Sequence, residues 1–65
     1  MKYRVFTRNW WTANKNYPGG REPKPGRKHT IRIVYSIEEA RAMCEQHNAT
    51  HAPGFLSNKA EFESI

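Results

Sequence analysis

The sequence predicts a small α+β domain of element order β-β-α-β, in which one helix packs on a short antiparallel sheet. Two segments in the first half alternate apolar and polar residues with the period of a strand. A capped segment in the second half has apolar residues at helical spacing, and a short alternating segment follows it. The 65 residues leave room for a single domain, residues 1–65, with a thin core.

The first predicted strand covers residues 2–11, KYRVFTRNWW, a segment rich in aromatic and β-branched types. Its alternation separates two faces, one of which suits a core while the other is basic and aromatic. The two sets are Tyr3, Val5 and Thr7 against Arg4, Phe6, Arg8 and Trp10.

Residues 12–29 predict a long basic loop. They hold three of the four glycines, three of the four prolines and five Lys or Arg residues. Connections of this length in a compact domain are commonly functional or disordered, so this loop is the first place to look for binding.

Residues 30–35, TIRIVY, predict a second strand antiparallel to the first. The alternation sets Ile31, Ile33 and Tyr35 against Thr30, Arg32 and Val34. The predicted core combines apolar residues of the two strands, the helix and the C-terminal segment. It consists of Val5, Ile31, Ile33, Ala40, Met43, Leu56 and Phe62.

A helix is predicted from Ile37 to about Asn48, because Ser36 and Glu39 form an S-x-x-E capping box before an apolar stripe. The stripe consists of Ile37, Ala40, Met43, Cys44 and His47. The segment Ala52-Pro53-Gly54 then breaks the chain, and residues 59–64 predict a short edge strand.

The charge of the chain is unevenly placed along the sequence. Eleven Lys and Arg against six Glu give a net charge of +5, with +7 in residues 1–30 and −2 in residues 31–65. If the fold keeps the two halves apart, the positive one attracts nucleic acid or an acidic protein surface. The plainer alternative is a solvated basic loop without a partner.

A nucleic-acid interface is the leading functional hypothesis, because guanidinium groups bind phosphates and aromatic rings stack on unpaired bases. On the first strand and its neighbour the candidate contacts are Arg4, Phe6, Arg8, Trp10, Trp11 and Arg32. In the loop they are Lys15, Tyr17, Arg21, Lys24, Arg27 and Lys28. The competing interpretation is that Phe6, Trp10, Trp11 and Tyr17 pack under the loop as a second apolar cluster.

Two further binding roles use overlapping residues. Trp, Tyr and Arg are enriched at interface hot spots, so the same surface suits a modulator that binds a host protein. An exposed edge strand also suits pairing with a second copy, as in a self-associating structural component. Phosphate binding weakens steeply as salt rises, whereas an aromatic protein interface weakens far less.

Neither catalysis nor a cofactor is expected. The chain has no Asp, and its six Glu are spread over loop, helix and tail, so no carboxylate cluster for metal-assisted hydrolysis is indicated. The spacing C-x2-H-x3-H of Cys44, His47 and His51, with His29 as a fourth candidate, has the ligand types that zinc prefers. A second pair from a separate element is missing, so we expect a core Cys and ordinary helix-end histidines.

The sequence predicts an intracellular protein. The N-terminal segment alternates charged and apolar residues without the apolar run of a signal peptide, and no stretch approaches a membrane span. Cys44 is the single cysteine, so no intrachain disulfide forms. A reducing cytoplasm is the expected compartment.

Four motifs along the chain carry a resemblance to a known family. They are F-T-R-x-W-W in FTRNWW, an E-P loop in GREPKPGRKHTI, E-E-A-R in the helix, and P-G-x-L-S-x-K-A-E-F near the end. Over nearly its whole length the chain thereby resembles small uncharacterised proteins encoded by tailed bacteriophages. The resemblance implies a protein made in the cytoplasm of an infected bacterial host, of a kind that commonly binds a host factor or nucleic acid. It brings no catalytic residues.

Overall fold

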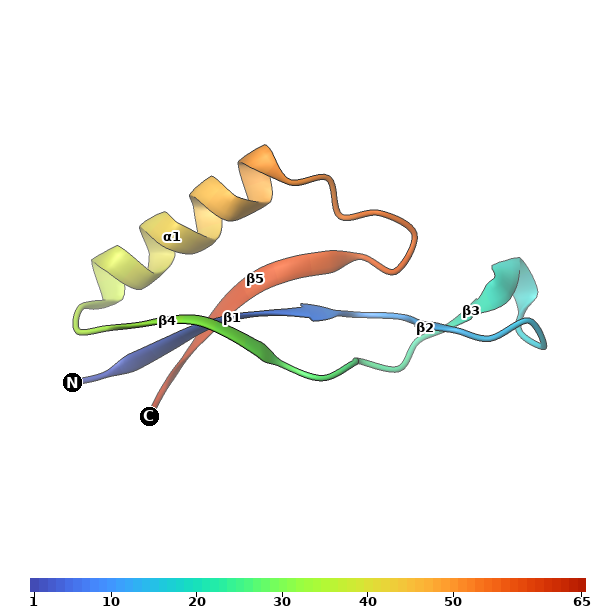
Figure 1. Cartoon of the computed structure of the whole chain (residues 1–65), viewed down its shortest axis with the longest axis horizontal. Coiled ribbons are helices and arrows are strands. Elements are labelled where there is room, and N and C mark those ends of the chain that lie inside the picture. Colours follow the sequence, from blue (N-terminus) through green and yellow to red (C-terminus); the bar gives the residue numbers. More distant parts are fainter.

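A three-stranded antiparallel sheet carries one helix on one of its faces in the computed structural model, which describes all residues 1–65 (Figure 1). The sheet has the order β4-β1-β5, so β1 is central, and a separate two-stranded ribbon joins β2 and β3. The expected α+β class and the order β-β-α-β of the main elements are confirmed. The elements are β1 (Tyr3–Asn9), β2 (Thr12–Ala13), a 3₁₀ turn (Pro18–Gly20), β3 (Arg21–Glu22), β4 (His29–Val34), α1 (Ile37–Thr50) and β5 (Asn58–Ser64).

The helix begins where the capping signal predicts. The Glu39 N–H donates to the Ser36 hydroxyl oxygen at 3.1 Å, and Ser36 has extended backbone angles. This bond satisfies one of the free N–H groups of the first turn, while two acidic side chains, Glu38 and Glu39, lie at the positive end of the helix. The helix ends at Thr50, two residues beyond the expected end. It is too short and too polar to span a membrane.

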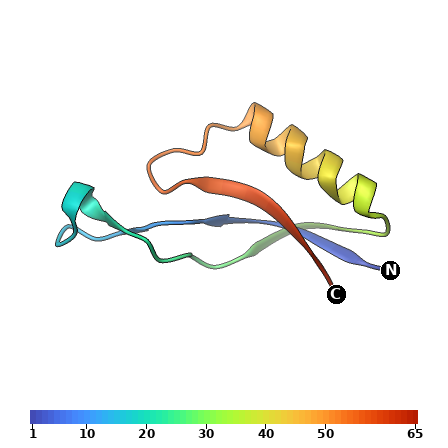
Figure 2. The ribbon, with the colours of Figure 1, turned by 180° about the vertical axis from the view of Figure 1, so that it is seen from behind.

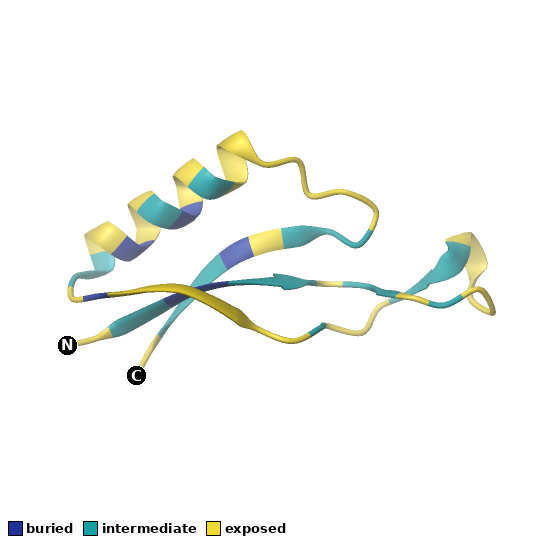
Figure 3. Cartoon of the chain, in the orientation of Figure 1, coloured by how far each residue is buried: buried dark blue, intermediate teal, exposed yellow.

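The core lies between α1 and the sheet and is thin. Its buried residues are Val5, Val34, Ala40, Cys44 and Ala60, with Tyr3, Met43 and Phe62 packed around them. The predicted core is therefore correct at Val5 and Ala40 and nearly so at Met43 and Phe62. Figure 3 shows how little of the molecule is fully buried.

Two predicted core positions on β4 are wrong. Ile31 and Ile33 are 47% and 37% exposed, whereas Val34, expected on the outer face, is 2% exposed. One reason is the register of β4 against β1: Val34 pairs with Tyr3 on the core face, Ile33 pairs with Arg4 on the other face, and Ile31 is the extra residue at a register shift. The other is that α1 lies mainly over β5 and β1, so it leaves β4 largely uncovered.

Residues 10–28, here called the arm, project for most of their length from the end of the sheet away from both termini (Figures 1 and 2). The last residues return to the sheet, where Gly26 donates to the Asn9 carbonyl and Lys28 pairs with Glu63. The predicted long loop is thus in part a hairpin, because Thr12 pairs with Glu22 and Ala13 with Arg21. Gly19 and Gly20 turn the chain at the tip with φ near 79°. The arm makes the molecule elongated: its radius of gyration is 13.3 Å, against about 10.7 Å for a compact chain of this length.

Candidate nucleic-acid interface

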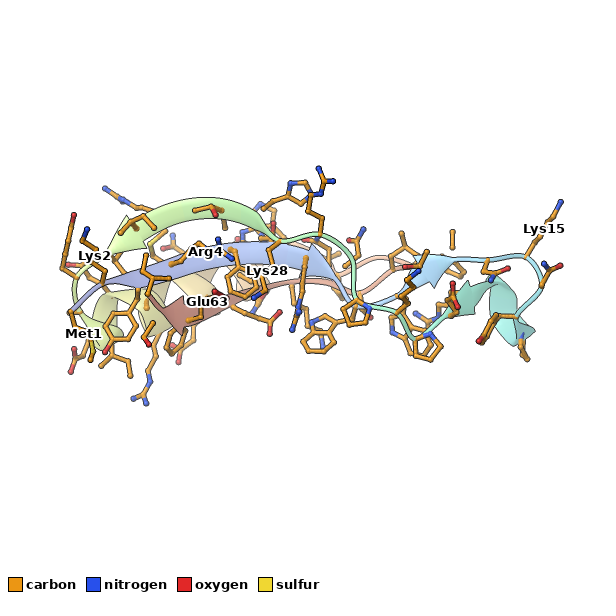
Figure 4. The ribbon with its side chains drawn as sticks, turned by 90° about the horizontal axis from the view of Figure 1, so that it is seen from below. Met1, Lys2, Arg4, Lys15, Lys28 and Glu63 are labelled. Carbon is orange, nitrogen blue, oxygen red and sulfur yellow. The ribbon has the colours of Figure 1, made fainter.

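The face of the sheet opposite the helix carries the basic and aromatic side chains of β1 (Figure 4). The alternation of β1 places Arg4, Phe6 and Arg8 on this face, as the sequence predicts, because Val5 lies in the core against α1. Phe6, however, is 3% exposed. The cations of Arg4, Arg8 and Lys28 lie 5.5, 5.9 and 4.9 Å from its ring centroid. The charged side chains cover the Phe6 ring, so the expectation that Phe6 stacks on a base is wrong.

Ion pairs with β5 balance the positive charge of this face. The Arg8 Nε lies 2.8 Å from the Glu61 Oε2, and the Arg4 guanidinium lies 3.4 Å from Glu63. Lys28 donates to the other oxygen of Glu63 at 2.7 Å, as the grouping in Figure 4 shows. This hydrogen bond and the nearby cations hold the pKa of Glu63 below its ordinary value. The two glutamates were not among the expected site residues, and only the strand order brings them here.

Trp10 lies at the junction between the sheet and the arm. The guanidinium carbon of Arg8 lies 4.4 Å from its ring centroid, and the ring remains 37% exposed. The N–H groups of Trp10 and Trp11 both donate to the carbonyl of Leu56, at 3.0 and 3.1 Å. The base of the arm is therefore tied to the turn before β5, and Trp10 keeps part of its ring accessible.

A second cation–π stack holds the arm further out. The guanidinium carbon of Arg21 lies 4.4 Å from the Trp11 ring centroid and 5.4 Å from that of Phe55. Arg21 also donates to the carbonyl of Phe55 at 2.6 Å. The alternative of a second aromatic cluster is thus realised in part, with arginines between the rings. Phe55 was missed from the sequence, where its only signal is an aromatic residue in a Pro-Gly turn.

Three exposed cations of the arm have no carboxylate partner. Lys15, Lys24 and Arg27 take part in none of the three ion pairs of the chain, and Lys15 lies at the far tip (Figure 4). Tyr17, beside it in sequence, is 44% exposed. The arm as a whole contains five Lys or Arg and one Glu, so it holds +4 of the net charge of +5.

Arg32 does not extend the basic face of β1, and this part of the predicted interface is wrong. Its cross-strand partner is Val5, whose side chain points toward the helix, and directly paired residues share a face. Arg32 also alternates with Ile33, which pairs with Arg4. Residues 32–34 pair regularly with β1, so this register places Arg32 on the helix side of the sheet together with Val34, opposite to the face expected from the sequence.

The residues of the weak zinc motif do not converge. Cys44 is 9% exposed within the core, where burial, followed by the charges of Glu61 and Glu45, raises the pKa of its thiol. His47 and His51 stack on each other with ring centroids 4.0 Å apart. No group of three or more His, Cys, Asp or Glu residues is placed to hold a metal ion.

No family model, curated protein or solved structure matches the chain.

Proposed function

We propose that the protein is a non-enzymatic binding module that contacts nucleic acid through the arm, residues 10–28. The observation that carries the proposal is the concentration of charge: the arm holds +4, and the other 46 residues together hold +1. Four of the five cations of the arm, all except Lys28, take part in no ion pair. A polyanion is attracted to such a concentration of positive charge, and counterions are released when it binds.

The arm differs from the β1 face in the availability of its charges. Arg4, Arg8 and Lys28 are each within 3.4 Å of a carboxylate. A phosphate would have to displace Glu61 or Glu63 to reach them. The other four cations of the arm need no such exchange, so the proposed footprint moves from the strand face to Lys15, Arg21, Lys24 and Arg27.

The shape of the arm suits a nucleic acid. A two-stranded ribbon fits the major groove of a duplex, and a basic ribbon with exposed rings can also follow a single strand. Tyr17 at the tip and Trp10 at the base are 44% and 37% exposed and can stack on bases. The contact with phosphate is common to both modes, and a comparison of single-stranded and duplex ligands separates them.

The test is the fluorescence anisotropy of labelled single- and double-stranded DNA and RNA, titrated with the protein at several salt concentrations. Four unpaired arm cations predict a slope of log K against log salt between about −3 and −4. Going from 50 to 200 mM salt should then lower the affinity roughly 100-fold.

Matched triple variants locate the contact. Substitution of Lys15, Lys24 and Arg27 by alanine should reduce the slope to about −1, because Arg21 is then the one unpaired cation left in the arm. The control removes three exposed cations outside the arm that also lack ion-pair partners, by substituting Lys2, Arg32 and Arg41. Absence of binding at low salt would overturn the proposal, as would equal effects of the two triple variants.

A second candidate function rests on the aromatic residues. Trp10, Tyr17 and Phe55 are exposed, and Trp10 and Phe55 lie next to arginines, a composition typical of hot spots in protein interfaces. A modulator of a host bacterial protein would use these rings. Two results together would favour this protein-binding function. The protein should capture one bacterial protein at high salt, with capture abolished by Tyr17→Ala and Phe55→Ala, and it should show no salt-sensitive binding of nucleic acid.

A further inference from the structure

One edge strand of the main sheet, β5, is covered by a side chain of the helix, whereas the other, β4, has no strand beside it. At the β5 edge, the side chain of Asn48 in α1 accepts a hydrogen bond from the Ala60 N–H at 2.9 Å and donates one to the Ala60 carbonyl at 3.2 Å. An amide side chain therefore occupies the position that another strand would take. β4 pairs on one side with β1 and has no strand on its other side.

The open edge is also apolar. Ile31, Ile33 and Tyr35 are 47%, 37% and 68% exposed, and Arg32 is the one charged residue from residue 30 to 35. Figure 3 shows β4 exposed over most of its length. Monomeric proteins usually protect such an edge with several charges, a proline or a strong bulge. The inserted residue at Ile31 is the one such device here, and the pairing of residues 32–34 beyond it is regular.

A depression lies beside β4 on the face of the sheet that carries the helix. Because α1 lies over β5 and β1, a shallow depression of about 220 Å³ remains between α1 and β4. Ile31 and Met43 line it, with the polar ends of Gln46, His47, Thr50 and His51 around them. An added strand would cover part of this depression with its own side chains.

We propose that β4 pairs antiparallel with β4 of a second copy across a two-fold axis, forming a continuous sheet of six strands. The axis is perpendicular to the sheet, so both helices lie on the same face and the two depressions meet at the centre. Such an interface is isologous, because the same strand supplies both sides. The two arms then project from opposite ends of the dimer, since each follows the direction of its own β1.

The surface area supports a second copy as the occupant. The chain exposes 4781 Å², whereas a compact monomer of 7.6 kDa exposes about 4300 Å². The excess of roughly 500 Å², part of which belongs to the arm, approaches the 600 to 1,000 Å² or so that each partner buries in a standard interface. Six of 65 residues are buried, and chains of this size commonly complete their core by self-association.

Sedimentation velocity and light scattering over a range from low to high micromolar protein test the proposal. The mass should rise with concentration from 7.6 kDa to twice that value and no further. The two-fold axis puts Ile33 of both copies on the same face of the joined sheet. Ile33→Lys therefore adds one cation from each copy to that face of the interface, and like charges across a strand pair are destabilising. The dimer dissociation constant should rise about tenfold or more.

The matched control is Ile65→Lys, the same substitution at a 59% exposed isoleucine following β5. It should leave the mass unchanged, as should alanine substitution of the arm cations. The dimer therefore does not depend on the proposed function, and either can fail alone. Circular dichroism shows whether each variant is folded.

Amide hydrogen exchange on the unmodified protein gives a test without a variant. Amides of β4 should become more protected as protein concentration rises, whereas those of β5 should not change. A monomer at high micromolar concentration would overturn the proposal. So would growth beyond a dimer, or a folded Ile33→Lys protein that dimerises as well as Ile65→Lys.

Discussion

Arg8 holds together the face of the sheet that lies away from the helix, and replacing it by alanine is expected to destabilise the fold. Its guanidinium donates to both oxygens of Glu61, at 2.8 and 3.4 Å. It also lies 4.4 Å from the ring centroid of Trp10 and 5.9 Å from that of Phe6. One substitution therefore removes an ion pair, a stacking contact and part of the cover over a buried ring.

The magnitude follows from these three contributions. The Arg8 and Glu61 side chains are 22% and 28% exposed, so their ion pair is worth about 1 kcal/mol, at the upper end for surface pairs. The stack on Trp10 adds about 0.5 to 1 kcal/mol. Exposing part of the Phe6 ring costs about 1 kcal/mol more, since apolar surface costs about 25 cal/mol for each Å² exposed. The expected loss is about 2 to 3 kcal/mol, which lowers the melting temperature of a domain this small by roughly 10 to 20 °C.

Urea unfolding followed by tryptophan fluorescence measures this loss, and thermal unfolding by circular dichroism gives an independent value. The control is Arg32→Ala, which removes an exposed arginine without an ion pair and should cost less than about 0.5 kcal/mol. If Arg8→Ala costs no more than Arg32→Ala, the idea that Arg8 stabilises this face is refuted.

Two further predictions concern the edge of β5 and the stability in acid. Asn48→Ala removes two hydrogen bonds to the backbone of Ala60 and should cost about 1 to 3 kcal/mol in urea unfolding; a loss under about 0.5 kcal/mol would contradict this role. The hydrogen bond from Lys28 is the largest cause of the lowered pKa of Glu63. The ionised Glu63 carboxylate therefore stabilises the fold fully above the ordinary pKa of 4.5, and this stabilisation is lost as the pH falls through the lowered pKa. Lys28→Met should therefore flatten the fall in melting temperature on acidification, and an unchanged fall would exclude the ion pair as its cause.

The charge distribution along the sequence differs from that on the surface of the folded protein. Along the sequence, the first 30 residues carry +7 and the remainder −2, which suggests one basic half. In the fold, β5 lies beside β1, and its glutamates pair with arginines more than 50 residues earlier. The excess charge then remains on the arm. This is why the proposed interface differs from the expected strand face.

Local signals in the sequence were enough to locate the main elements. The Ser36 cap, the alternation in β1 and the breaking segment after α1 act over a few residues, and each placed its element within two residues of the observed bounds. The two faces of β1 also followed from the sequence alone, because successive side chains of a strand point to opposite sides.

Which strands are neighbours, and where the helix lies across them, depended on the tertiary structure. The pairing of Arg8 with Glu61, the sealing of Phe6 and the exposure of Ile31 all result from the order β4-β1-β5 and the position of α1 over β5. No short-range preference encodes these features, because strand partners are selected by the burial that the whole chain achieves. Backbone preferences therefore determined the elements, while long-range packing decided which of their side chains remain free to bind.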